Sequence, residues 1–398
     1  MNLPPAPSLP AGFTAAVASA AIKKPGRTDM ALLRCPAGAA LAAMYTTNRV
    51  CAAPVQLSRR RLRESRGHCA ALLVNSGCAN AATGDHGMAA AIELTDRVAR
   101  ACDVSPEAVQ SNSTGVIGVQ LPLERMLAQV DHLASEARPG TIEAFARAIM
   151  TTDTSPKWSS RTVEHGGRRC TVVGCAKGAG MIHPDMATMI AVLLTDAPLA
   201  PTELDGHLRA AVERSFHRIS IDGDTSTNDA VFALASGAAE TPAEGFPAEA
   251  IGAAFREVAR DLAMMIVRDG EGFERGIHVR VSGTATDADA LAVARTVASS
   301  LLVRCAVTGG DPNWGRILAA AGRAGVRFDV ADVELDVGGV SVFAHGTPSS
   351  TPLERREAAF RAPMVEVDLR LGAGPGRDEF IGCGLTEAYV RLNADYTT

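Results

Sequence analysis

Short runs of apolar residues recur along this chain of 398 residues, and they predict strands. In chain order, the runs are 30–33, 41–45, 70–74, 172–175, 189–194, 230–235, 277–281, 333–337 and 365–371. The last run, VEVDLRL, alternates between apolar and polar residues, which is typical of a half-buried antiparallel strand.

Between these runs lie segments whose apolar residues have helical spacing. In residues 88–104, for example, Ile92, Leu94 and Val98 predict one buried helix face. The pattern also predicts helices at 121–134, 201–216, 248–267, 287–302 and 353–360. This irregular mixture indicates a mixed α/β fold, with layers of helices and much antiparallel sheet, rather than a strict βαβ repeat.

Composition and charge narrow the classes of function. The chain is 47% hydrophobic and 21% charged, so it can bury a substantial core. Its net charge of −5 gives no reason to expect nucleic acid or a membrane as partner, and the basic run SRRRLRESR (58–66) fits a solvated helix face. The first residues, MNLPPAPSLPAGF, do not resemble a signal peptide, and no apolar stretch reaches the roughly 18 residues of a membrane span. We therefore expect a cytoplasmic protein.

The sequence does not predict a metal site or a disulfide framework. Its nine cysteines include no C-x-x-C pair and are expected to be reduced and mostly buried. Its nine histidines are scattered. The segment DGDTSTND (222–229) places oxygens at alternate positions but lacks the glycine and the glutamate of a calcium loop.

Clusters of glycine with polar residues mark the places where chemistry is expected, because glycine lets the backbone approach a ligand closely. The motifs of phosphate-cradling loops, dinucleotide-binding folds and common serine hydrolases do not occur. The cluster KGAGMIHPDMATM (177–189) places Thr188 directly before an apolar run. Thr188 is therefore a candidate nucleophile.

A threonine hydroxyl needs a nearby base to become a nucleophile. If the bond between Ala187 and Thr188 were cut, Thr188 would gain an α-amine with an unperturbed pKa of about 7.7 to 8, within reach of its own hydroxyl. The segment STG (113–115) offers the Thr114 hydroxyl and the Gly115 N–H as donors for an oxyanion. From the residues alone, the alternative is that Thr188 is a β-branched residue that begins a strand.

Taken together and in order, these clusters resemble the ornithine acetyltransferase family, also called the bifunctional glutamate N-acetyltransferase and amino-acid N-acetyltransferase family. The resemblance extends from about residue 13 to residue 398. It rests on the motifs AAIKKPGRTDMALL, AAMYTTNRVCAAPV, VNSGCANAATG, STGVIG, KGAGMIHPDMATM, DGDTSTND, DPNWGRI and VRLNADYTT.

The resemblance implies a precursor that cuts itself between Ala187 and Thr188. The pieces, an α chain of residues 1–187 and a β chain of residues 188–398, would stay together and form an α2β2 heterotetramer. The implied fold is the layered α/β sandwich of self-processing aminopeptidases. The glycines and Pro184 would form a strained turn that presents the Ala187 carbonyl to the Thr188 hydroxyl.

The implied reaction moves an acetyl group from N2-acetyl-L-ornithine to Thr188, with Thr114 and Gly115 stabilising the oxyanion, and then to L-glutamate. No cofactor is required, and the sequence leaves open whether acetyl-CoA also serves as a co-substrate. The implied substrate contacts are Thr151, Lys177, Thr188, Glu271, Asn393 and Thr398. A substrate carboxylate suits Lys177 and a substrate ammonium suits Glu271.

One position departs from the family pattern. Asp185 stands where asparagine is common and adds a negative charge close to the cut.

Two other functions remain open. An amidase or aminopeptidase would use the same threonine but pass the acyl group to water, and a non-catalytic amino-acid-binding protein would never cut itself.

Overall fold

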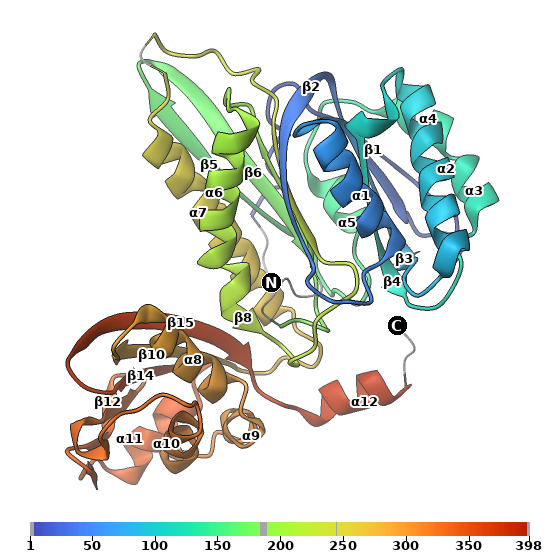
Figure 1. The fold of residues 1–398 in the computed structure, drawn as a ribbon. Coiled ribbons are helices and arrows are strands. Elements are labelled where there is room, and N and C mark those ends of the chain that lie inside the picture. Colours follow the sequence, from blue (N-terminus) through green and yellow to red (C-terminus); the bar gives the residue numbers. More distant parts are fainter. Residues whose placement is uncertain (1–3, 184–188, 244, 396–398) are drawn as a thin grey trace. The chain divides into compact units, whose positions relative to one another are not determined.

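The computed structural model describes residues 4–183, 189–243 and 245–395. They divide into two compact units (Figure 1). The first comprises described residues up to 217 and from 224 to 266, and the second comprises residues 218–223 and those from 267 onward. Each unit has its own sheet.

The described residues of the first unit form a sheet of eight strands in the order β4-β3-β2-β9-β7-β6-β5, with β1 paired to β2. The strands are β1 (Thr14–Ala18), β2 (Met30–Tyr45), β3 (His68–Cys78), β4 (Val109–Val116), β5 (Lys157–His165), β6 (Arg168–Lys177), β7 (Ile190–Thr195) and β9 (Ala230–Ala235). The pairs β3–β4 and β7–β9 are parallel and the others are antiparallel. The prediction of a mixed α/β fold is confirmed.

The runs 30–33 and 41–45, predicted as two strands, belong to the single strand β2. Its first half pairs with β3, the register shifts between Arg34 and Ala39, and its second half also pairs with β9. Gly38, in this interval, has φ +84°, a conformation that favours glycine. The irregularity connects the two halves of the sheet through one strand.

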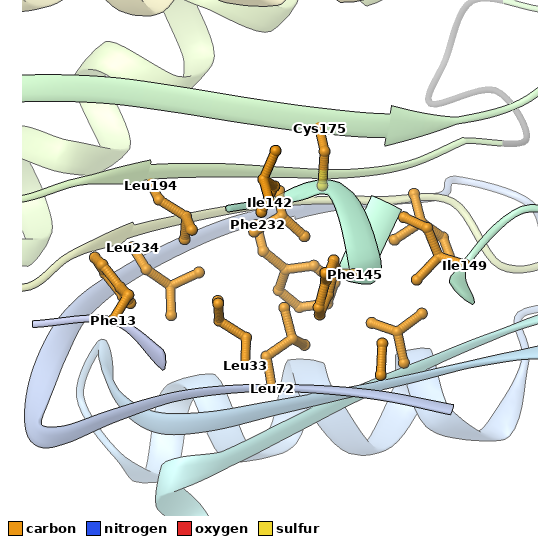
Figure 2. Close-up of a cluster of buried hydrophobic side chains, with 14 of the residues drawn as sticks. Phe13, Leu33, Leu72, Ile142, Phe145, Ile149, Cys175, Leu194, Phe232 and Leu234 are labelled. Atoms are coloured by element: carbon orange, nitrogen blue, oxygen red, sulfur yellow. The ribbon is translucent and has the colours of Figure 1, made fainter. Parts of the chain in front are cut away.

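The two halves of the sheet enclose a hydrophobic core. Figure 2 shows Cys175 of β6 and Leu194 of β7 on one side, and Leu33 of β2 and Leu72 of β3 on the other. Phe145, from the short helix α5 (Glu143–Ala148), fills the space between them and is fully buried. The half of the sheet that carries β6 and β7 is thereby packed onto the half that carries β2 and β3.

Six further helices belong mainly to the first unit: α1 (Ala53–Glu64), α2 (Gly84–Cys102), α3 (Leu123–Leu127), α4 (Val130–Glu136), α6 (Pro201–Glu213) and α7 (Ala248–Arg268). Helices α1 to α4 lie beside β1, β3 and β4 (Figure 1), α6 packs on β2 and β9, and Val258 and Leu262 of α7 lie beside Gly174 of β6. Leu94 and Val98 of α2 are buried, as predicted. The predicted helix 121–134 is wrong as one element, because α3 and α4 are separate helices; Met126 and Val130, on either side of the break, are both fully buried.

Two predictions from charge and cysteine use can be compared with the burial of side chains. The basic run 58–66 is only partly a solvated face, because Arg61 of α1 is 4% exposed and lies 2.5 Å from Asp96 of α2. All nine cysteines are free, and seven of them are buried, which confirms the prediction of reduced, mostly buried thiols. Burial raises the pKa of the Cys175 thiol to about 12.

In the second unit, the described residues form a seven-stranded sheet in the order β13-β12-β11-β14-β10-β15-β8. The strands are β8 (Ile219–Ser220), β10 (Gly276–Gly283), β11 (Glu334–Val337), β12 (Val340–Ala344), β13 (Thr347–Pro348), β14 (Met364–Arg370) and β15 (Gly374–Cys383). The helices are α8 (Asp287–Ala298), α9 (Leu301–Gly309), α10 (Trp314–Gly322), α11 (Leu353–Phe360) and α12 (Glu387–Asp395). Apolar residues of α8 to α11 pack on one face of this sheet.

Two predicted elements differ in detail. The alternating run near residue 365 is half-buried as predicted, but β14 is antiparallel only to β11 and runs parallel to β10. The predicted helix 287–302 ends at Ala298, and a second helix begins at Leu301 after a bend of 57°. In the described part of the chain, no single helix has the length and apolar character to cross a membrane. Helices α8 and α9 meet these length and composition criteria only when they are taken together, as a bent pair.

Candidate active site

The two residues predicted to stabilise an oxyanion lie at the end of β4. Thr114 is 4% exposed, and Gly115 pairs with Gly77 of the neighbouring strand β3. Gly115 has φ +131°, and a Cβ atom on it would lie 2.3 Å from the carbonyl carbon of Gly77. Since no side chain fits between these backbones, only glycine allows β4 to keep this position beside β3.

Lys177 ends β6 and reaches the same place. Its side chain is 3% exposed, and its Nζ donates a hydrogen bond of 3.3 Å to Thr114 Oγ1. An ammonium group can only donate, so the Thr114 oxygen accepts here and its own proton remains available for another acceptor. The predicted substrate-binding lysine and the predicted oxyanion donor are therefore in direct contact.

A buried carboxylate, Asp153, organises this group. Its Oδ1 accepts hydrogen bonds from Lys157 Nζ at 2.7 Å and from the Gly178 N–H at 2.6 Å, and its Oδ2 accepts one from the Thr151 N–H at 2.9 Å. Lys177 Nζ lies 4.0 Å from the same Oδ2. Burial acts to raise the pKa of Asp153, but the Lys157 and Lys177 charges and the two hydrogen bonds to Oδ1 hold it well below its ordinary value.

The predicted cut lies in the connection between β6 and β7, which are neighbouring antiparallel strands with Lys177 opposite Ile190. Both ends of this connection are held by buried carboxyl groups. The Gly178 N–H donates to Asp153 Oδ1, and the Met189 N–H donates to Asp229 Oδ1 at 2.9 Å. The predictions for Pro184, Asp185, Ala187 and Thr188, including the strained turn, concern positions outside the described residues.

Asp229 precedes β9 and is fully buried. Its Oδ2 has no hydrogen-bond partner among the residues that the structure describes. Burial raises the pKa of Asp229 well above its ordinary value, opposed in part by the Met189 N–H, the Lys177 charge and the Ser226 N–H. The preceding residue, Asn228, donates from Nδ2 to the carbonyl oxygens of Ala79 and Ser113, which joins this segment to the end of β4.

Two other predicted substrate contacts meet in the second unit. Glu271 lies in the turn after α7, and its Oε2 accepts a hydrogen bond of 2.9 Å from Asn393 Nδ2 of α12. The neighbouring Gly272 has φ +68°, and a Cβ atom on it would lie 2.5 Å from the backbone nitrogen of Tyr389. Glycine therefore allows the DGEG turn to touch α12, whereas Thr398 lies outside the described residues.

The structure thus brings together Thr114, Gly115, Thr151 and Lys177 in the first unit, and Glu271 and Asn393 in the second. The sequence reasoning assigned no role to Asp153, Lys157 or Asp229. A signal was present, since Asp229 ends the quoted segment DGDTSTND, and Asp153 and Lys157 lie in the polar segment TTDTSPK (151–157). In the described ranges, no three His, Cys, Asp or Glu side chains are grouped as a metal site.

Residues 14–398 match the sequence model of the ArgJ family. The chain belongs to the ArgJ family. An ArgJ relative from Thermosynechococcus vestitus, the arginine biosynthesis bifunctional protein, is 44% identical over 97% of this chain and 96% of that protein. The protein of the same name from Nitratidesulfovibrio vulgaris is 44% identical over 97% of this chain and 98% of that protein.

Two solved structures of ArgJ proteins are similar over part of the chain. The protein from Bacillus halodurans is 37% identical, with a TM-score of 0.48 over 50% of this chain and 96% of that chain. The ornithine acetyltransferase from Mycobacterium tuberculosis, solved with ornithine, is 38% identical, with a TM-score of 0.39 over 44% of this chain and 92% of that chain. The predicted membership in the ornithine acetyltransferase family, and with it an acyltransferase of arginine biosynthesis, is confirmed at the level of the ArgJ family.

Proposed function

We propose that this ArgJ protein cuts itself between Ala187 and Thr188 and then transfers the acetyl group of N2-acetyl-L-ornithine to L-glutamate. The observation that carries the proposal is the contact between Lys177 and Thr114 beside Gly115. Lys177 ends β6, where the connection containing the proposed cut begins, so this contact supports a role for Thr114 and Gly115 as oxyanion donors near the cut. The names of the ArgJ relatives and the ornithine complex of the Mycobacterium tuberculosis protein support the same substrate class.

The reaction proceeds by double displacement. The Thr188 hydroxyl attacks the acetyl carbonyl while its α-amine takes the hydroxyl proton, and the Thr114 hydroxyl and Gly115 N–H stabilise the oxyanion. The C–N bond of acetylornithine breaks, the amine returns the proton to the departing ornithine, and acetyl-Thr188 remains. The α-amine of glutamate then attacks this ester and leaves as N-acetylglutamate.

The substrate contacts follow from charge. Lys177 binds the substrate carboxylate, and Glu271 with Asn393 binds the side-chain ammonium of ornithine. Thr151 and Thr398 orient the remainder. The ordinary reaction needs no cofactor, and the word bifunctional in the relatives' names supports acetyl-CoA as an additional acetyl donor.

The two pieces would share one sheet. Strands β7 and β9 would come from the β chain, residues 188–398, and β1 to β6 from the α chain, residues 1–187. Since β9 pairs with β2, and β7 pairs with β6, backbone hydrogen bonds join the two pieces along both strands. This sharing supports chains that stay together and assemble as an α2β2 heterotetramer, and the reduced thiols support a cytoplasmic location.

The test is to change Thr188→Ala and measure intact mass and products. We expect the variant to remain a single chain of 41.3 kDa and to transfer no acetyl group, whereas the unchanged protein yields fragments 1–187 and 188–398. Thr195→Ala is the matched control, because Thr195 is a buried threonine at the other end of β7. An uncut Thr188→Ala protein that makes N-acetylglutamate would refute the mechanism. If the unchanged protein instead gives acetate as its main product, it is a hydrolase.

A further inference from the structure

The segment that follows the proposed nucleophile is anchored by a single carboxyl group. Strands β7 and β9 are parallel, with Ile190 opposite Ala230, so Met189 and Asp229 lie side by side just before the two strands begin. The Met189 N–H donates to Asp229 Oδ1 at 2.9 Å. Asp229 therefore holds the backbone one residue after Thr188.

The second oxygen of this carboxyl group is unusual. A buried carboxyl oxygen normally has a hydrogen-bond partner, because its removal from water is costly. Asp229 Oδ2 is buried and has none among the described residues. The nitrogen atoms of successive residues in any peptide are no more than about 4 Å apart, since only Cα and the carbonyl carbon separate them. Because Asp229 Oδ1 lies 2.9 Å from the Met189 nitrogen, covalent geometry alone limits the nitrogen of the preceding residue to within about 7 Å of this oxygen.

We propose that Asp229 is a positioning residue that holds the α-amine of Thr188 through Oδ2 once the chain is cut. This inference rests on the proposed function, because only the cut creates that amine. The carboxylate orients the amine toward the Thr188 hydroxyl and stabilises the ammonium that forms when the amine takes the hydroxyl proton. A buried carboxylate does the same for the histidine base of serine proteases without itself taking the proton.

The charges around Asp229 agree with this role. Among the described residues of the uncut chain, the charged and titratable groups that face it are Lys177, at the end of β6, and the thiol of Cys51, just before α1. The pKa of Asp229 stays raised, because burial outweighs the Met189 N–H, the Lys177 charge and the Ser226 N–H together. An ammonium on Thr188 supplies the nearby cation that lowers this pKa and favours the carboxylate.

The pH dependence of the uncut chain follows from the sign of this shift. A carboxyl group whose pKa is higher in the folded state than in the unfolded state contributes stability at low pH, and this contribution is lost as the pH rises through the folded value. In a Thr188→Ala background, Asp229→Asn should therefore stabilise the protein at neutral and higher pH. A melting curve in this background also establishes that the variant folds.

The decisive experiment uses Asp229→Asn in the otherwise unchanged protein. Asparagine keeps an acceptor for Met189 but removes the charge, so we expect a folded variant that still cuts itself, because the amine exists only after the cut. In the cut fraction we expect kcat to fall by about tenfold or more with KM for N-acetylornithine changed less than about threefold. The acidic limb of kcat/KM should move to lower pH, because the amine loses the carboxylate that raises its pKa.

Asp196→Asn is the matched control. Asp196 is also buried and follows the same strand β7, but at its opposite end, and its oxygens accept the Thr171 and Ala11 N–H groups. It should leave kcat and the pH profile unchanged within about twofold. Complete cleavage with an unchanged kcat and pH profile in Asp229→Asn, or an equal loss in Asp196→Asn, overturns the inference. An unchanged protein that never cuts itself or transfers acetyl groups overturns the proposed function instead, and the inference falls with it.

Discussion

Asp153 is the residue whose loss should disturb the candidate site most through its charge alone. Its carboxylate faces two buried ammonium groups, Lys157 at 2.7 Å and Lys177 at 4.0 Å, whose side chains are 1% and 3% exposed. Asp153→Asn keeps the shape of the side chain but removes the negative charge between them. Breaking a buried ion pair by removing one partner costs about 3 to 5 kcal/mol, because the remaining charge stays out of water.

This cost predicts a large change in thermal stability. For a unit of this size, 1 kcal/mol shifts the melting temperature by about 2–4 °C, so Asp153→Asn should melt roughly 10 °C lower. The measurement is best made by calorimetry in a Thr188→Ala background, so that every sample is one uncut chain. The surface pair Arg209–Asp205 is the control, since Asp205→Asn removes an exposed ion pair worth only about 0.5 kcal/mol.

The pH dependence of this effect has a definite sign. The pKa of Asp153 is lowered in the folded protein, so its contribution to stability is present above its unfolded pKa, about 3.9, and is lost as the pH falls through the lower folded value. The difference between Asp153→Asn and its parent should be constant above about pH 5 and shrink below about pH 4.

A second substitution tests the cause. Adding Lys157→Met to Asp153→Asn removes the nearest buried ammonium and should recover part of the lost stability, because apolar replacement of a buried pair costs little. Melting of Asp153→Asn within about 1 °C of its parent at pH 7, where about 10 °C is expected, would refute the reasoning.

Two further substitutions test the geometry of the two groups of site residues. Gly115→Ala should destabilise the protein by about 2 to 4 kcal/mol and lower kcat about a hundredfold or more, because its Cβ would meet the Gly77 backbone and displace the oxyanion donor. Urea denaturation and steady-state kinetics measure both, and Gly118→Ala, which also has positive φ but nothing within 4 Å, should cost only about 1 kcal/mol and leave kcat unchanged. Glu271→Gln should raise KM for N-acetylornithine about tenfold with little change in kcat, because it removes a charge that binds the substrate ammonium. The exposed Glu274→Gln is its control, and an equal rise in KM there would contradict the assignment of Glu271.

Only about half of the strands and helices could be predicted from the sequence, and β1, β5, β12, β15, α10 and α12 are among those that were not. The strand β9 and the helix α11 begin and end where the apolar pattern places them, β7 and α7 agree to within one residue, and β10 agrees to within two. The errors lie where tertiary contacts override local pattern. The strand β4 was missed because its residues, VQSNSTGV, are mostly polar, although six of its eight positions are buried. The buried hydroxyl and amide groups there find partners only in the folded chain, as when Ser113 Oγ donates to Asn75 Oδ1.

The candidate site divides in the same way. Its residue types were readable from short motifs, because the STG and KGAG segments each carry their glycines and polar side chains within a few positions. The roles of Asp153 and Asp229 were not readable, since an aspartate in a polar loop usually lies in water. Only burial beside a lysine or a backbone N–H distinguishes them from ordinary loop residues.

The sequence by itself determined the family of this protein, its mixed class of fold and the chemical groups available to it. These depend on side-chain types and on their spacing over a few residues. The tertiary structure alone decided that Lys177 meets Thr114, 63 positions earlier in the chain, and that two buried carboxyl groups hold the ends of the connection between β6 and β7. Such contacts depend on which strands become neighbours and on how far each side chain is removed from water, and neither quantity is a property of a local stretch of sequence.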